Sequence, residues 1–213
     1  MSFVNKHYIS DTHFGHQRML DMQPRPFTDI HDHDEWMVTC WNDVVGRDDI
    51  VFHLGDFAAR LHETDRIRSL FSRLNGRKYL VIGNHDVDKK GALHPTLAAL
   101  AWESRPEHGL RTKDGGHDLW LSHYAARTWP SSHHGSFHFY GHSHGRLPGV
   151  GRSRDVGVDV PDVDFTPRTF AYLTRGILET ENLKMRATRG DVDAALAILD
   201  RAPDVEPDPG DEL

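Results

Sequence analysis

The chain of 213 residues is 38% hydrophobic and 27% charged, a composition typical of a soluble globular protein with one domain. A formal net charge of −7 argues against stable nucleic-acid binding, which usually needs a basic surface. The single cysteine, Cys40, excludes an internal disulfide and a thiolate metal site, so any metal ligands must be nitrogen or oxygen atoms.

The sequence shows neither a secretory signal nor a membrane-spanning segment. The N-terminal segment lacks the basic start, apolar core and small-residue cleavage site of a secretory signal. No apolar run approaches the roughly 20 residues that cross a bilayer. We therefore expect a cytoplasmic protein with no membrane partner, and the pattern specifies no oligomeric state.

Strands and helices alternate in the first half of the predicted structure. Apolar residues at helical spacing predict two helices. The apolar stripe of the first runs from Trp36 to Val45 and includes Trp41, and that of the second runs from Ile67 to Leu74. We interpret both tryptophans as core residues. Strands are predicted at 50–54, 79–82, 119–121, 137–140 and 170–173. Because the second half has few helices, the pattern indicates an α/β fold with one mixed sheet or two packed sheets and helices outside.

The C-terminal end shows two further patterns. Val192, Ala195, Leu196 and Leu199 recur at helical spacing and predict a short amphipathic helix that packs on the outside of the domain. Beyond it, prolines mix with acidic residues. We expect one domain over residues 1–201 and an acidic, Pro-rich, disordered tail over residues 202–213.

Polar side chains with metal-binding chemistry follow five predicted strands. In open sheets, ligands bind beyond the carboxyl ends of the strands, and glycine lets the chain turn there without a β-carbon clash. Each cluster alone could be a turn. Together they offer only carboxylate, amide and imidazole groups, which predict a metal site. The clusters are Asp11-Thr12-His13, Gly55-Asp56, Gly83-Asn84-His85-Asp86, Ser122-His123 and Gly141-His142-Ser143-His144.

The order Asp-x-His, Gly-Asp, Gly-Asn-His-Asp and Gly-His-x-His resembles the calcineurin-like metallophosphoesterase superfamily. The match runs from residue 11 to residue 144, and residues 9–16 and 52–57 further resemble a small, single-domain bacterial and phage branch. This resemblance implies a four-layer αββα sandwich of two mixed β-sheets flanked by helices. Ala59 and Ser122 depart from the family pattern, which often has Asp and Gly there, but neither position is a metal ligand in the family.

The resemblance also implies two divalent metal ions that share one carboxylate, Asp56. One ion would be held by Asp11, His13, Asp56 and His144, and the other by Asp56, Asn84, His123 and His142. A carboxylate can hold two cations roughly 3.5–4 Å apart, a separation suited to a shared hydroxide. This set of ligands favours Mn²⁺, with Fe, Zn²⁺ and Ni²⁺ as alternatives.

In the reaction implied by the resemblance, a metal-bridging hydroxide attacks phosphorus. His85 then protonates the departing oxygen, and Asp86 orients the His85 ring. We expect substrate contacts from Asn84, His16 and Arg127. The predicted partner is a small phosphorylated substrate, such as a nucleotide or a cyclic phosphate, bound as a phosphodiester or a phosphomonoester.

Other residues near the motifs allow more than one interpretation. We expect His53 to support the ligands from within a strand. Arg18 and Arg146 could bind phosphate as Arg127 could, although surface arginines are common. The run of His133, His134 and His138 fits a solvated loop as well as a binding site, and it stays unassigned.

Three rival functions remain open at this point. A non-catalytic scaffold that kept the fold predicts missing ligands or a missing acid, yet every position is filled. A nuclease acting on nucleic-acid ends agrees poorly with the net charge. A purely structural metal site is usually a closed tetrahedron, unlike this paired set.

Overall fold

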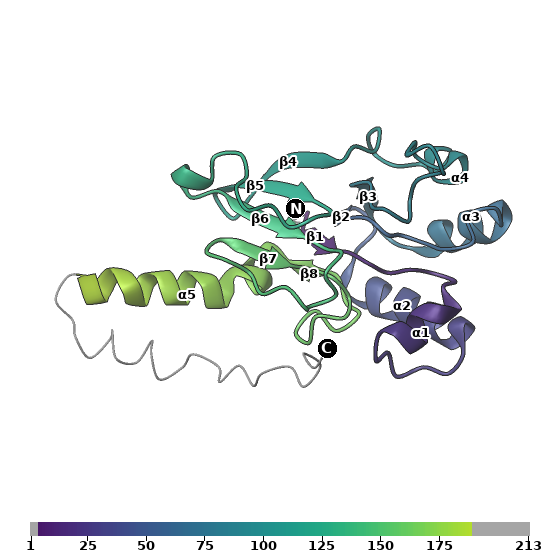
Figure 1. Cartoon of the computed structure of the whole chain (residues 1–213), viewed down its shortest axis with the longest axis horizontal. Helices are drawn as coiled ribbons and strands as arrows, with labels where there is room; N and C mark the ends of the chain where they lie inside the picture. The colour runs from purple at the N-terminus through teal and green to yellow at the C-terminus, as the bar shows by residue number, and fades with distance from the viewer. Residues whose placement is uncertain (1–3, 189–213) are drawn as a thin grey trace, which may run out of the picture. The chain divides into compact units, whose positions relative to one another are not determined.

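The computed structural model describes residues 4–188 (Figure 1). Contacts divide the chain into two compact units, residues 1–173 and 174–213. The predicted domain end at residue 201, the helix over 192–199 and the tail over 202–213 lie outside the described residues. Within the described part, no helix is long and apolar enough to cross a membrane.

The first unit contains two mixed four-stranded sheets. The first sheet has the order β3-β2-β1-β8, in which β1 and β3 each run parallel to β2 and β8 runs antiparallel to β1. Its strands are β1 (Lys6–Ile9), β2 (Ile50–His53), β3 (Arg77–Leu80) and β8 (Arg168–Thr169). The three parallel strands end at one edge of the sheet, where the first three motifs follow.

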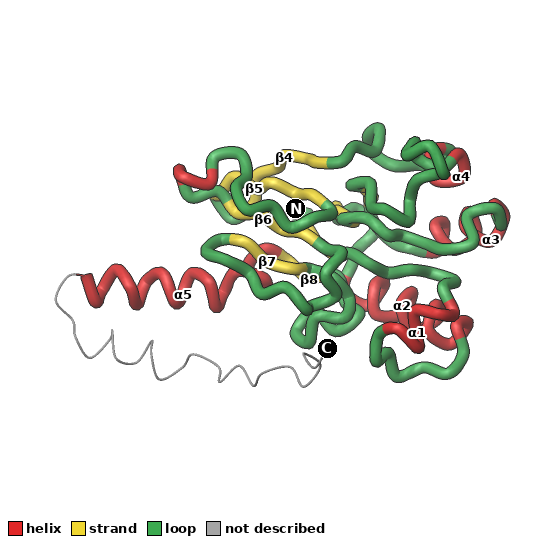
Figure 2. The backbone as a smooth tube through the Cα atoms, viewed as in Figure 1, coloured by secondary structure: helices red, strands yellow, loops and turns green. Residues whose placement is uncertain are grey.

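The second sheet has the order β4-β5-β6-β7, with β4 antiparallel to β5 and the other pairs parallel. Its strands are β4 (Gly109–Asp114), β5 (His117–Ser122), β6 (Phe137–Tyr140) and β7 (Ser153–Asp155). Figure 2 shows loops that follow the strands. By the bounds of the elements, the predicted ligands lie in such loops and not within strands.

The two sheets meet through aromatic side chains. The Tyr8 ring on β1 stacks on Phe52 with centroids 5.5 Å apart and meets the edge of Phe139 on β6 at 5.0 Å. The Tyr8 hydroxyl donates to Asp114 Oδ2 at 2.9 Å. Because side chains alternate along a strand, Ile9 faces the opposite side of the first sheet and packs with the helices.

The helices of the first unit are α1 (Gln17–Met22), α2 (Ile30–Val44), α3 (Thr64–Arg73), α4 (Pro95–Ala98) and the 3₁₀ turn Ser132–His134. Asp29 begins α2 by accepting from the backbone N–H of His31 at 2.6 Å. Buried residues of α2 and α3, such as Trp41 and Phe71, share one core with the parallel strands. The observed α/β arrangement of two mixed sheets with helices agrees with the predicted fold class.

Two sequence predictions about elements are wrong. Residues 170–173 are not a strand, because α5 (Phe170–Thr188) begins there. Phe170 and Leu173 are buried while Ala171 and Tyr172 are exposed, a helical spacing that a short apolar run conceals. Trp36 is not a core residue, since half of it is exposed, whereas Trp41 is fully buried as predicted.

Candidate metal centre

The loops that carry the motifs have an unusual backbone. Five of the predicted ligands adopt the left-handed region: Asp11 (φ 60°), His13 (φ 49°), Asp56 (φ 58°), His142 (φ 66°) and His144 (φ 49°). Non-glycine residues rarely adopt this conformation, at a cost of about 1–3 kcal/mol each, and it persists only where the surroundings enforce it. Such strain gathered at one edge of the sheets indicates a functional site.

Glycines allow these loops to approach one another. A β-carbon at Gly55 would lie 2.8 Å from the Cα atom of Gly83, so the loops after β2 and β3 touch through their backbones. At Gly141, a β-carbon would lie 2.5 Å from Asp11 Oδ2. Any larger residue would therefore push a predicted ligand out of place.

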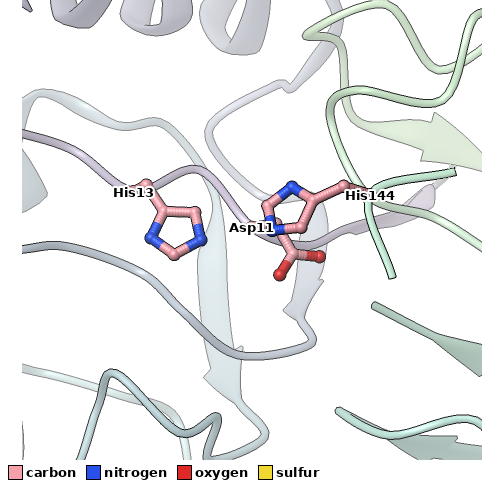
Figure 3. A group of neighbouring side chains, drawn as sticks. All are labelled: Asp11, His13 and His144. Carbon is pink, nitrogen blue, oxygen red and sulfur yellow. The ribbon is translucent and has the colours of Figure 1, made fainter. Parts of the chain in front are cut away.

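Three side chains form what we call the inner cluster: Asp11, His13 and His144 (Figure 3). Their candidate ligand atoms lie within 4.8 Å of one another. His144 donates from Nδ1 to Asp159 Oδ2 at 2.6 Å, which leaves its Nε2 as the available ligand atom. The Nε2 atom of His13 is buried and has no hydrogen-bond partner among the described residues. An unpaired buried nitrogen beside a buried carboxylate fits a metal ion.

The outer cluster consists of Asp56, His123 and His142, again with candidate ligand atoms within 4.8 Å. His123 donates from Nδ1 to the Leu54 carbonyl at 2.8 Å, so its Nε2 faces Asp56 Oδ2 at 3.4 Å. The same nitrogen lies 3.0 Å from Asn84 Oδ1. Asn84 therefore lies beside this cluster.

Asp56 also reaches the inner cluster. Its Oδ2 lies 3.6 Å from His13 Nε2 and 3.4 Å from His123 Nε2. His85 groups with His13 and Asp56, and its backbone N–H donates to Asp56 Oδ1 at 2.8 Å. One buried carboxylate thus lies between both clusters, which is the place that the resemblance assigns to a shared ligand.

Electrostatics of the metal-free site follow from this crowding. Burial raises the pKa of Asp11 to about 7. Burial acts to raise the pKa of Asp56 as well, but its hydrogen bond with His123 and the charges of His123 and His13 hold that pKa well below its usual value. Although burial opposes it, Asp56 raises the pKa of His123 to about 9. A proton on His123 therefore balances Asp56, and a bound cation would take over that role.

Asp86 has a different place from the one predicted. It is fully buried, and its two oxygens accept from the backbone N–H groups of Gly83 (2.8 Å), Asp56 (2.9 Å) and Phe57 (2.9 Å). These bonds occupy the carboxylate with main-chain donors in place of the His85 ring. Asp86 thus fastens the loops that carry Asp56 and His85.

Sequence reasoning missed two aspartates, Asp155 at the end of β7 and Asp159 shortly after it. Asp155 accepts from Ser143 Oγ at 2.7 Å and from the Gly145 backbone N–H at 2.9 Å, while Asp159 accepts from His144. The signal was the pattern Asp155-Val-Gly-Val-Asp159 at a strand end. It went unnoticed because β7 has only three residues and was not predicted.

No family model matches the chain. An 86-residue segment is 36% identical to an uncharacterized protein of Methanocaldococcus jannaschii and covers 40% of this chain and 49% of that protein. The gene 66 protein of Mycobacterium phage L5 is 32% identical over 132 residues, which are 56% of this chain and 63% of the phage protein. The chain thus spans only about half to three fifths of the length of these curated relatives.

Solved structures give a longer match. A protein of unknown function from Aquifex aeolicus has a TM-score of 0.58 and 22% identity, over 78% of this chain and 95% of its own length. A novel archaeal phosphodiesterase is similar with a TM-score of 0.42 and 20% identity, over 72% and 82% of the two chains. The chain therefore shares its fold with the Aquifex aeolicus protein.

The structure also places several other residues that the sequence singled out. The His16 ring lies 5.3 Å from that of His13 and 5.7 Å from that of His85, so His16 borders the site. His53 is buried and bonds Thr12 Oγ1 through Nε2 at 2.9 Å, which supports the loop between two predicted ligands. Arg127 is exposed four residues after His123 and is not among the side chains that the clusters bring together.

The remaining residues are not among the side chains of the two clusters. Arg146 donates to Gln23 Oε1 at 3.0 Å, and Arg18 is exposed. His138 is buried on β6, where its Nε2 accepts from the Ala126 backbone N–H at 3.0 Å. His133 and His134 are exposed on the 3₁₀ turn. His138 is therefore packed within the second sheet, separately from its two neighbours.

Proposed function

We propose that the chain is a metal-dependent phosphoesterase that hydrolyses small phosphate esters, with small nucleotides and cyclic phosphates as the favoured substrates. The observation that carries this proposal is the position of Asp56. A buried carboxylate lies between two groups of imidazole and carboxylate ligands, each with its candidate atoms within 4.8 Å. The unpaired Nε2 of His13 and the absence of thiolate ligands favour divalent ions bound by nitrogen and oxygen.

Two ions would be held by the residues of the two clusters, with Asp56 common to both. The inner cluster would bind one ion, and the outer cluster together with Asn84 would bind the other. Bound there, the ions would supply an activated water nucleophile and would neutralise charge on the phosphoryl oxygens. We propose Mn²⁺ as the metal, because borderline and hard ligands are mixed in the set.

His85 is proposed as the group that protonates the leaving oxygen. It is exposed to a substrate, while its backbone N–H is fixed to Asp56 Oδ1 at 2.8 Å. Its ring lies 5.1 Å from that of His13, so it stands at the rim of the clusters. Exposed Asn84 and half-buried His16 flank it and would contact the phosphate or its substituent.

The test is hydrolysis of bis-p-nitrophenyl phosphate and p-nitrophenyl phosphate by the chelator-stripped protein, with and without Mn²⁺. We expect turnover that requires metal and that falls to background in Asp56→Asn, because the shared carboxylate then loses its charge. The preferred ester shows whether diesters or monoesters should be pursued, and nucleoside 2′,3′-cyclic phosphates follow. His62→Ala serves as the control, since His62 is exposed and outside the clusters.

A non-catalytic scaffold with the same fold is the alternative. It would bind metal through the same clusters yet hydrolyse neither ester nor any cyclic nucleotide with any of Mn²⁺, Fe²⁺, Zn²⁺ or Ni²⁺. Metal binding without turnover would therefore contradict the proposed hydrolysis, whereas absence of metal binding would contradict the proposed metal centre itself.

A further inference from the structure

Arg25 occupies a buried position that the reaction described above does not use. It lies between Pro24 and Pro26 in the segment that joins α1 to α2, and its side chain is completely excluded from solvent. The flanking prolines have a fixed φ angle and favour an extended backbone at Arg25, which restricts the conformations open to the segment.

All five N–H donors of the Arg25 guanidinium have partners. Nε and Nη2 donate to the two oxygens of Asp159, both at 2.8 Å. Nη2 also donates to the Asp11 carbonyl at 2.9 Å, and Nη1 donates to the Thr12 carbonyl at 3.2 Å. The fifth bond joins Nη1 to His33 Nε2 at 3.0 Å. One cation therefore holds the main chain of the first motif and the carboxylate that binds His144.

The bond to His33 extends this arrangement into α2. Arginine can only donate, so His33 Nε2 must accept and the ring proton must sit on Nδ1. Nδ1 then donates to Asp34 Oδ1 at 3.0 Å, which also accepts from the Gly15 backbone N–H at 3.0 Å. We call the chain Asp34–His33–Arg25–Asp159–His144 the Arg25 network.

We infer that Arg25 is a positioning residue for the inner metal ion. Through Asp159 it fixes the His144 ring with Nε2 directed to the ion, and through two carbonyl groups it fixes the strained turn that presents Asp11 and His13. This inference rests on the proposed metal centre. Hydrogen-bonded partners behind metal ligands typically change metal affinity or activity by about 10–100-fold when they are removed.

Within the described residues, the histidines of the outer cluster are held without an arginine of this kind. His123 is held by one main-chain carbonyl, and the rings nearest to His142 are those of Tyr124, 4.6 Å away, and His123, 5.1 Å away. Loss of the Arg25 network should therefore weaken one ion and spare the other. A merely structural role for Arg25 would affect both ions alike.

The experiment is a calorimetric titration of the chelator-stripped full chain with Mn²⁺, in wild type, Arg25→Lys and Asp159→Asn. Lysine keeps the charge but cannot make the paired bonds to Asp159, and asparagine keeps the size but loses the charge. We expect one of two binding events to weaken by about 10–100-fold in both variants, with the other unchanged.

Arg73→Lys is the matched control. Arg73 makes the same two-bond contact with a carboxylate, donating to the two oxygens of Glu35 at 2.7 and 2.5 Å, but on the surface between α3 and α2. It should bind both ions as wild type does. If Arg25→Lys fails to fold, as judged by circular dichroism, Asp159→Asn provides the same readout without the loss of a buried cation.

Two outcomes would overturn the inference alone: unchanged affinity for both ions in a folded variant, or equal weakening of both. A wild-type protein that binds no Mn²⁺, Fe²⁺, Zn²⁺ or Ni²⁺ would instead overturn the proposed metal centre, and this inference with it.

Discussion

The two clusters share one carboxylate but differ in how their histidines are held. His144 of the inner cluster is bound by Asp159, which in turn pairs with a fully buried arginine. His142 of the outer cluster is exposed and lies among the rings of Tyr124 and His123. The contrast teaches that one half of the site is fixed before any ligand arrives, while the other half is open. Charge and burial order the inner half, and the open half is where a substrate can enter.

The largest effect should come from the rim of the open half. In His85→Ala, kcat should fall by about 10²–10⁴-fold, the usual contribution of a positioned general acid, because the leaving oxygen loses the group proposed to protonate it. Both metal affinities should persist, since the backbone N–H of residue 85 still donates to Asp56. Steady-state kinetics and metal titration of the same samples check this. Loss of metal binding together with activity would instead indicate that His85 is a metal ligand. His62→Ala is the control for both measurements.

Asp86, which fastens the loops that carry Asp56 and His85, should contribute to the stability of the folded protein. Asp86→Ala leaves three buried N–H groups without an acceptor, and we expect a loss of about 3 kcal/mol in the free energy of unfolding. Asp86→Asn should lose less, because one acceptor oxygen remains. Urea unfolding of the metal-free protein measures both.

Asp88→Ala is the control for this change. Asp88 also accepts from two backbone N–H groups, those of Lys90 at 2.8 Å and Ala92 at 3.0 Å, but at an exposed turn where water can replace it. Equal losses in the free energy of unfolding for Asp86→Ala and Asp88→Ala would show that burial does not make the Asp86 hydrogen bonds more stabilising than exposed ones.

Two groups of the metal-free site should make the stability of the folded protein depend on pH. The pKa of His123 is raised to about 9 by Asp56, against the opposing effect of burial, and burial raises that of Asp11 to about 7. Both folded values exceed the unfolded values, so the contribution of each of these two groups to stability falls as the pH rises. For His123 that loss extends from about pH 6.5 to about pH 9.

Urea unfolding in chelator at pH 6.5, 7.5 and 8.5 tests this dependence, with His123→Gln as the comparison. The glutamine variant should show a shallower fall in stability, because it has no proton to lose. A difference in stability between wild type and His123→Gln that does not shrink as the pH rises would contradict the assignment of a proton to His123.

The sequence predicted which residues gather in the two clusters better than it predicted the residues behind them, for a physical reason. Asp11, His13, Asp56 and the Gly-His-x-His pair directly follow strands, and parallel strands end at one edge. Arg25 and Asp159 are 134 residues apart, and no local pattern links them. The two-residue β8 and the three-residue β7 are too short to show an alternating pattern. The short apolar segment that begins at Phe170 fits a strand and a helix equally well by its sequence. The burial of Phe170 and Leu173 in the structure distinguishes the helix from the strand.

The smallest expected effect concerns Tyr124, at the edge of the open half. About half of the side chain is exposed, its ring lies 4.6 Å from that of His142, and its hydroxyl donates to Asn84 Oδ1 at 3.4 Å. An exposed ring beside a proposed metal ligand can stack on a nucleobase. Tyr124→Ala should therefore raise KM for adenosine 2′,3′-cyclic phosphate by about fivefold, the low end of base–aromatic stacking.

Tyr124→Phe separates the ring from the hydroxyl. It should keep the wild-type KM, because a hydrogen bond as long as 3.4 Å contributes little beside the stacking surface. Tyr172→Ala is the control, since Tyr172 is another partly exposed tyrosine, packed on Arg168 away from the clusters. If the phenylalanine variant is impaired as much as the alanine variant, the hydroxyl acts through Asn84, and the open half would then be ordered by hydrogen bonding much as the inner half is.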